Sequence, residues 1–241
     1  MDLAGYAGFL LLAVLVVAGS FALDWLFVRI LPVRFLYYAV RLPGVILHEL
    51  AHIAGCILTG AKVKNVVLFS KEGGSVSYAN PEFPVLGNVI IGTAPLIVLP
   101  LVLSILTWIF ATYLHCTLAI TIPEAGSTNA PCLLVAMVID LFYANLVLRF
   151  NSWFLLYLYL SVTIVLSLAP SRQDFSNAAI GIAFLAGCGL LILFSGFVPA
   201  IALLGKILDL MTYPFMLGLI FEMIAGVAAL PLLVIYGIRS R

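Results

Sequence analysis

Long apolar runs recur along almost the whole of this 241-residue chain. Hydrophobic residues make up 65% of it and charged residues 9%, whereas soluble domains carry about 25% charged residues. A run of about 18 or more apolar residues can cross the ~30 Å hydrocarbon core of a bilayer as a helix. The sequence therefore predicts an all-α polytopic membrane protein with about six or seven transmembrane helices. The expected apolar segments cover residues 5–31, 35–59, 86–113, 132–148, 152–170, 177–195 and 200–238.

No long polar linker divides the chain, so we expect a single membrane-embedded domain over residues 1–241. Its core is expected to comprise residues 35–113 and 152–195. Residues 114–150 are interpreted as a re-entrant or interfacial insertion, because their apolar part is short for a crossing helix and carries polar residues.

Two of the three histidines lie four residues apart in the pattern H-E-x-x-H, inside an apolar stretch. Residues four apart on a helix share a face about one turn apart, so His48 and His52 can hold one Zn²⁺ ion. Glu49 stands beside them, placed to take a proton from a zinc-bound water. The alternative is a pair of satisfied core histidines. It does not explain polar groups among Val, Ile, Leu and Ala, where burying even a lone polar group costs roughly 2–7 kcal/mol.

After Gly60, which stands where a helix C-cap is expected, the pattern changes to short β-branched stretches. Residues 62–69 are too short to span a membrane, and residues 75–78 can return as a second strand after a glycine-containing turn. We predict a small β-hairpin at the membrane surface. Its exposed edge, with Val66 and Leu68, could pair with an unwound substrate segment. The alternative is a surface clasp that does not touch substrate.

A catalytic zinc keeps three protein ligands and a water, so the two histidines need a partner. Carboxylates at membrane depth are the candidates. We choose Asp174, which follows a proline-broken end of an apolar run; its alternative role is an N-cap of the next helix. Glu222, in an apolar helix, is the reserve third ligand. Asp140 and Asp24 are weaker candidates that we expect to be hydrogen-bonded within the bundle or near an interface.

Three short motifs carry a family resemblance: His48-Glu49-Leu50-Ala51-His52, Gly60-Ala61-Lys62-Val63-Lys64 leading to Gly73-Gly74, and Gly92-Thr93-Ala94-Pro95-Leu96. Together they resemble the site-2 protease family of intramembrane zinc metalloproteases, and the third is similar to the small-residue, proline-containing motif of that family's next helix. In that family an Asp on a later helix completes the zinc site. Asp174 within Ala-Pro-Ser-Arg-Gln-Asp is the position that best resembles it.

The chain departs from that family around the expected third ligand. The family's motif has an Asn and two prolines before Leu-Asp-Gly, whereas Phe175 follows the Asp here and Leu166 stands where the Asn would fall. The resemblance implies that this Asn helps to position substrate. Asn88, Ser167 or Ser171 is expected to substitute for it.

A zinc site that joins His52 to Asp174 limits how the intervening chain crosses the membrane. If each apolar run from 86 to 170 crossed fully, three crossings would place Asp174 near the opposite face. One run must therefore not cross, and residues 132–148 are the expected re-entrant or interfacial one.

These features predict an intramembrane zinc metalloprotease that cleaves peptide bonds in or near transmembrane segments, with Zn²⁺ as cofactor and Glu49 as general base. Its expected partners are a transmembrane protein substrate and the lipid bilayer, in the cell membrane of a prokaryote. Three alternatives stay open: a prenyl-protein-type membrane zinc protease with Glu222 as third ligand, a transporter or channel with these residues as ion ligands, and an inactive relative that binds membrane segments.

Charge and cysteine spacing argue against a nucleic-acid partner and against a cysteine-based zinc or redox site. The net charge is +1 and no basic stripe is present, so we expect no nucleic-acid partner. The four cysteines form no C-x-x-C zinc or redox motif. Cys116 and Cys132 bracket a polar loop and could either form a disulfide or stay as free thiols.

Overall fold

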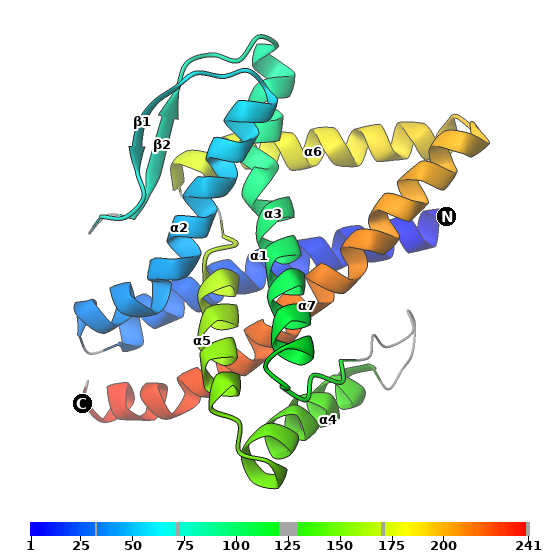
Figure 1. The fold of residues 1–241 in the computed structure, drawn as a ribbon. Coiled ribbons are helices and arrows are strands. Elements are labelled where there is room, and N and C mark those ends of the chain that lie inside the picture. The colour runs from blue at the N-terminus through cyan, green and yellow to red at the C-terminus, as the bar shows by residue number, and fades with distance from the viewer. Residues whose placement is uncertain (32, 71–72, 121–129, 170–171, 240–241) are drawn as a thin grey trace.

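The computed structural model describes residues 1–31, 33–70, 73–120, 130–169 and 172–239; the side chains of residues 34, 130, 131, 172–179 and 235–239 lie outside that description. The described chain is mostly helical, with one small hairpin (Figure 1). Its elements in order are α1 (Leu3–Ile30), α2 (Arg34–Leu58), β1 (Val63–Val67), β2 (Ser75–Tyr78), α3 (Pro84–Thr112), α4 (Ala130–Phe142), the π-helical turn η1 (Tyr143–Leu148), α5 (Ser152–Leu166), α6 (Arg172–Phe194) and α7 (Val198–Arg239).

Four helices in the described part of the chain are long and apolar enough to cross a membrane: Leu3–Ile30, Phe35–Leu58, Pro84–Thr112 and Val198–Val234. Three other apolar helices are shorter, at Cys132–Leu148, Ser152–Leu166 and Ile180–Phe194. These lengths are compatible with a membrane protein, and the expected helical class with a small hairpin is confirmed. The expected count of six or seven crossing helices is not confirmed.

Helices α2, α3 and α5 pack side by side, and α1 and α7 pack on each other as they cross this group (Figure 1). Helix α6 crosses α3 at the end that carries the hairpin, while α4 lies at the opposite end. The largest hydrophobic cluster fills the space where α3, α5 and α7 meet, and its fully buried members include Leu99, Leu103, Phe154, Tyr157 and Phe221.

Two glycines let α2 approach its neighbours very closely. A Cβ on Gly44 would overlap the Thr163 carbonyl oxygen on α5. One on Gly55 would lie 3.0 Å from the Cα of Ile91 on α3. A side chain has no room at Gly44 and would require a small shift of α3 at Gly55, so these positions set how closely α2 packs on α5 and α3.

Prolines inside the helices leave carbonyl groups that neighbouring helices use. Proline has no N–H, so Pro43 in α2 cannot donate to the carbonyl four residues earlier, which belongs to Ala39. The Tyr159 hydroxyl of α5 donates to that Ala39 oxygen at 2.7 Å. A hydrogen bond lost within one helix thus becomes a contact between two helices.

The chain between α3 and α5 is fixed by two buried or half-buried asparagines. The Asn145 side chain on η1 accepts from the Thr117 amide at 2.8 Å and donates to the Thr117 and Leu141 carbonyls. Asn151 caps α5 and donates to the Leu114 carbonyl at 2.9 Å. These bonds hold the segment after α3 against α4 and the start of α5.

The hairpin lies along α2 (Figure 1). Strand β1 pairs antiparallel with β2, with Val66 opposite Val76 and an irregularity between Val63 and Asn65. Gly60 has a φ of 68°, the left-handed conformation expected of a helix C-cap. Val76 packs against a small buried cluster on α2 and α3, so the hairpin is anchored to the helices that it follows.

We expect Gly44→Ala to lower the thermal unfolding temperature of the purified protein, by the equivalent of about 1–3 kcal/mol, because the added methyl meets α5 backbone that cannot rotate away. Gly8→Ala is the matched control, since a Cβ there meets no atom within 4 Å. Equal unfolding temperatures for the two variants in the same detergent would contradict the close α2–α5 approach.

Candidate metal centre

His48 and His52 lie on one face of α2 and are both buried, with 7% and 5% of their surfaces exposed. Their ring centroids are 4.9 Å apart and their Nε2 atoms are 3.2 Å apart. The predicted helix therefore forms, and it directs the two imidazoles toward one point.

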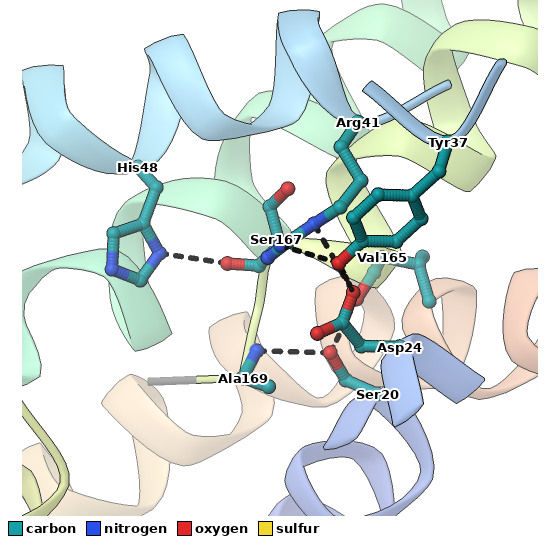
Figure 2. Close-up of polar contacts among 8 residues, drawn as sticks. All are labelled: Ser20, Asp24, Tyr37, Arg41, His48, Val165, Ser167 and Ala169. Atoms are coloured by element: carbon teal, nitrogen blue, oxygen red, sulfur yellow. Dashed lines mark hydrogen bonds and ion pairs between the residues drawn. The ribbon is translucent and has the colours of Figure 1, made fainter. Parts of the chain in front are cut away.

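Both rings are oriented by backbone carbonyls of other helices or helix ends. The Nδ1 atom of His48 lies 2.7 Å from the Ser167 oxygen just beyond α5, as Figure 2 shows. The Nδ1 atom of His52 lies 2.9 Å from the Ile91 oxygen in α3. A carbonyl oxygen can only accept, so each Nδ1 carries a hydrogen, and the neutral tautomer with that hydrogen has its lone pair on Nε2.

These two carbonyls are available because neither takes part in a regular helix ladder. Ile91 lies four residues before Pro95, which has no N–H to donate to it. Ser167 follows the last residue of α5, where the helix ends in tighter turns. Each imidazole of α2 thus binds a carbonyl in another helix or at its end, and that carbonyl has no hydrogen-bond donor among the described residues of the helix to which it belongs.

The spacing of the Nε2 atoms fits a shared metal ion. Two nitrogen lone pairs at 3.2 Å repel each other unless a proton or a cation lies between them. Two imidazole nitrogens bound tetrahedrally to zinc at about 2.0–2.1 Å are about 3.3 Å apart. A ring whose Nδ1–H binds a carbonyl while Nε2 faces the metal is also the usual arrangement of a zinc-bound histidine.

Glu49 is buried beside the pair, with 5% of its surface exposed. Its side chain lies against Gly74, directly before β2, where a Cβ would come within 2.6 Å of the Glu49 Oε1. The returning strand of the hairpin therefore covers Glu49, and a side chain at position 74 would displace the Glu49 carboxylate.

The structure places the expected substrate-binding residues at two locations. Asn88 lines a cavity of about 280 Å³ together with Val85 and Val89, which are also on α3, and with Ile180 of α6. Val66 in β1 and Leu68 directly after it are each 38% exposed. Ser171 and the side chain of Asp174 lie outside the described residues.

Glu222, the reserve third ligand, does not join the histidines. It is buried on α7, where its carboxylate lies against Gly19 of α1. Among the described side chains, no three His, Cys, Asp or Glu residues come together in a group that could hold a metal ion. The Glu222-based site is therefore wrong, because α7 presents this residue to α1 and not to α2.

Among the remaining acids, Asp24 behaves as expected. Its Oδ1 accepts a hydrogen bond from the Tyr37 hydroxyl at 2.9 Å and lies 3.1 Å from Arg41 Nε, which ties α1 to α2 (Figure 2). Asp140 is exposed on α4. All four cysteines are free thiols. Of the two alternatives for Cys116 and Cys132, the structure therefore has the free thiols and not the disulfide.

Sequence reasoning missed the groups that support the histidines. The sequence shows Pro95 as a proline in an apolar run, but only packing determines which group binds the carbonyl that this proline frees. Gly74 is a turn residue by its sequence, and its contact with Glu49 depends on how the hairpin folds back. The sequence suggests a role for the Ser167 side chain, whereas its backbone carbonyl is the group that binds His48.

Comparison with known families supports a zinc peptidase. Residues 42–153 match the family model described as "Putative zincin peptidase", and this stretch contains His48, Glu49, His52 and Pro95. The match indicates a zinc metallopeptidase and implies zinc as its metal. No curated protein and no solved structure matches the chain.

We expect Pro95→Ala to raise the zinc dissociation constant between about three- and tenfold, because the new N–H competes with His52 for the Ile91 carbonyl. This effect is smaller than the roughly 10–100-fold that is typical of outer-shell changes, because a carbonyl oxygen can accept two hydrogen bonds and His52 can keep its own. Zinc affinity is measured by competition with a chelator. Pro100→Ala makes the same change five residues further along α3 and is the control; an unchanged affinity in Pro95→Ala would show that the freed carbonyl is irrelevant.

Proposed function

We propose that this protein is an intramembrane zinc metalloprotease, similar to the site-2 protease family, that hydrolyses peptide bonds in or near transmembrane segments. The observation that carries the proposal is the buried His48–His52 pair, with both Nδ1 atoms on carbonyls and both Nε2 atoms facing each other. Long apolar helices and the match to a zinc peptidase family support the same conclusion.

When bound, zinc supplies a Lewis acid for amide hydrolysis and lowers the pKa of water. The Glu49 carboxylate accepts the proton of the attacking water and delivers it to the nitrogen of the leaving amine. Its burial against Gly74 restricts the side chain to few conformations and excludes bulk water from it. The same burial strengthens its electrostatic interaction with a cation at the histidine pair.

Asp174 is the proposed third ligand, and the course of α6 supports it. Gly181 of α6 packs tightly on Val89 and Thr93 of α3, which flank the carbonyl that binds His52. Asp174 precedes Gly181 by seven residues, or about 10 Å of helix, and packed helices lie about 8–10 Å apart. In Figure 1, α6 begins behind α2 and then crosses α3, so its first turn extends toward the helix that carries the histidines.

The return of the chain to His48 also bears on how many of the apolar runs between residues 86 and 170 cross the membrane. The α5 end reaches His48 through Ser167, and α4 and η1 pack at the opposite end of α3 and α5 (Figure 1). If the short segment between them turns at that end and does not cross the membrane, α3 and α5 cross it in opposite directions, and the chain returns to the side of the histidines. We propose this role for residues 114–150.

Substrate would enter along the hairpin and the Asn88 cavity. The hairpin covers Glu49, and β1 presents exposed Val66 beside its own edge, which pairs with no strand among the described residues. An extended segment added there would have its backbone hydrogen bonds satisfied by β1 and not by its own helix. Asn88 offers an amide in the otherwise apolar cavity between α3 and α6, where it can bind the unwound backbone.

Glu49→Gln is expected to lower the hydrolysis rate of a model transmembrane peptide by about 10²–10⁴-fold while the zinc content per chain stays unchanged. The amide keeps the size of the side chain but cannot accept the proton. Peptide cleavage is followed in detergent or vesicles, and Asp209→Asn, an exposed acid on α7, is the control. Full activity in Glu49→Gln would refute the proposed general base.

The same preparations test the third ligand. Asp174→Asn is expected to lose most of its bound zinc, whereas Glu222→Gln keeps it because Glu222 faces α1. The reverse result would move the site to α7.

A further inference from the structure

Ser20 of α1 is fully buried, with 0% of its surface exposed, and its hydroxyl is bonded to the end of α5. Its Oγ donates to the Val165 carbonyl at 2.6 Å and accepts from the Ala169 amide at 2.9 Å, as Figure 2 shows. The sequence offered no signal for this contact, because the bonded residues are 145 and 149 positions away.

The hydroxyl occupies the place of a helical hydrogen bond. In a continuing α-helix the Ala169 N–H would donate directly to the Val165 carbonyl, four residues earlier. Here Ser20 Oγ lies between the two groups and satisfies both. Helix α5 ends at Leu166, four residues before Pro170, which has no N–H to continue the helix. Ser167 and Leu168 make the tighter bonds to Ile164 and Val165 that are typical of a helix end, and the Ser20 hydroxyl holds the chain in this conformation.

Ending the helix at this point frees the carbonyl that orients His48. Ser167 lies between the two residues that Ser20 holds, and its oxygen points to His48 Nδ1 at 2.7 Å (Figure 2). In an uninterrupted helix that oxygen would lie along the helix axis and accept from a later amide. The position of the Ser167 carbonyl thus depends on the inserted hydroxyl.

Helix α1 is itself held in place for this role. One turn after Ser20, Asp24 binds Tyr37 and Arg41 of α2. Helix α1 therefore binds both partners of the His48–Ser167 contact, α2 through Asp24 and the end of α5 through Ser20. His52 does not depend on α1 in this way, because the Ile91 carbonyl that it binds lies inside α3 and is freed by Pro95.

We propose that Ser20 is a positioning residue for the zinc site, which acts on His48 through the Ser167 carbonyl. The inference rests on the zinc site proposed above. It assigns to α1, which lies outside the stretch matched to the zinc peptidase family, a part in metal binding.

The test compares zinc affinity in Ser20→Ala, Ser20→Cys, Ser20→Thr and Ser161→Ala, by chelator competition on the purified full chain. Ser20→Ala and Ser20→Cys remove the hydroxyl, and a thiol is only a weak donor and acceptor. Both are expected to raise the zinc dissociation constant about tenfold, the lower limit for outer-shell changes. Ser20→Thr keeps the hydroxyl and is expected to restore most of the affinity. Ser161→Ala is the matched control, because its hydroxyl on α5 is equally buried but is not bonded to the end of α5 that holds the Ser167 carbonyl.

A second measurement separates positioning from general destabilisation. The visible absorption spectrum of the Co²⁺-substituted protein reports the ligand geometry, and it is expected to change in Ser20→Ala but not in Ser161→Ala. Affinity and spectrum equal to the unsubstituted protein in Ser20→Ala would overturn the role of Ser20 alone, as would a Ser20→Thr variant as weak as Ser20→Ala. A lack of stoichiometric zinc in the unsubstituted protein would overturn the proposed function and this inference together.

Discussion

Two hydrogen bonds from imidazole Nδ1 atoms to backbone carbonyls determine what the buried histidine pair can do. They fix the tautomer of His48 and His52, and with it the direction in which each Nε2 lone pair points. Because the two lone pairs meet at 3.2 Å in a buried site, the arrangement suits a shared cation and is unfavourable for the rings alone. The position of Glu49, the cover of the hairpin and the proposed hydrolysis all depend on this geometry.

Both carbonyls are exceptions to the rule that helices satisfy their own backbone. Pro95 removes the donor that would bond the Ile91 carbonyl. The Ser167 carbonyl is free because α5 ends just before it, and Ser20 of α1 holds that end in place. In an apolar surrounding a free carbonyl is costly, so each of these exceptions is stable only because a neighbouring helix supplies a donor. The close α2 contacts at Gly44 and Gly55 bring the imidazoles within that reach. The site is therefore a product of helix packing, and the H-E-x-x-H helix could not orient both rings by itself.

The sequence predicted those features that depend on local pattern. The apolar runs predicted the helices to within a few residues, and the change of period after Gly60 predicted the hairpin. The four-residue spacing predicted that His48 and His52 share a face. It could not predict Ser20 or the Ser167 carbonyl, because their contacts join residues more than a hundred positions apart and use groups without a sequence signature. The prediction for Glu222 is wrong for the same reason: burial in an apolar helix does not reveal which neighbour the side chain faces. The number of crossing helices also depends on where the bilayer lies relative to the helices, and the length of an apolar run does not determine that position.

The most direct test of the account is X-ray absorption at the zinc edge of the protein purified without added chelator. Two imidazole nitrogens and a carboxylate should give a first shell of nitrogen and oxygen at about 2.0–2.2 Å, with the multiple-scattering features of histidine and no sulfur at about 2.3 Å. The account predicts one zinc per chain with that shell, and the imidazole features should weaken in His52→Ala. A sulfur-containing shell, or zinc that binds equally well after both histidines are replaced, would contradict it.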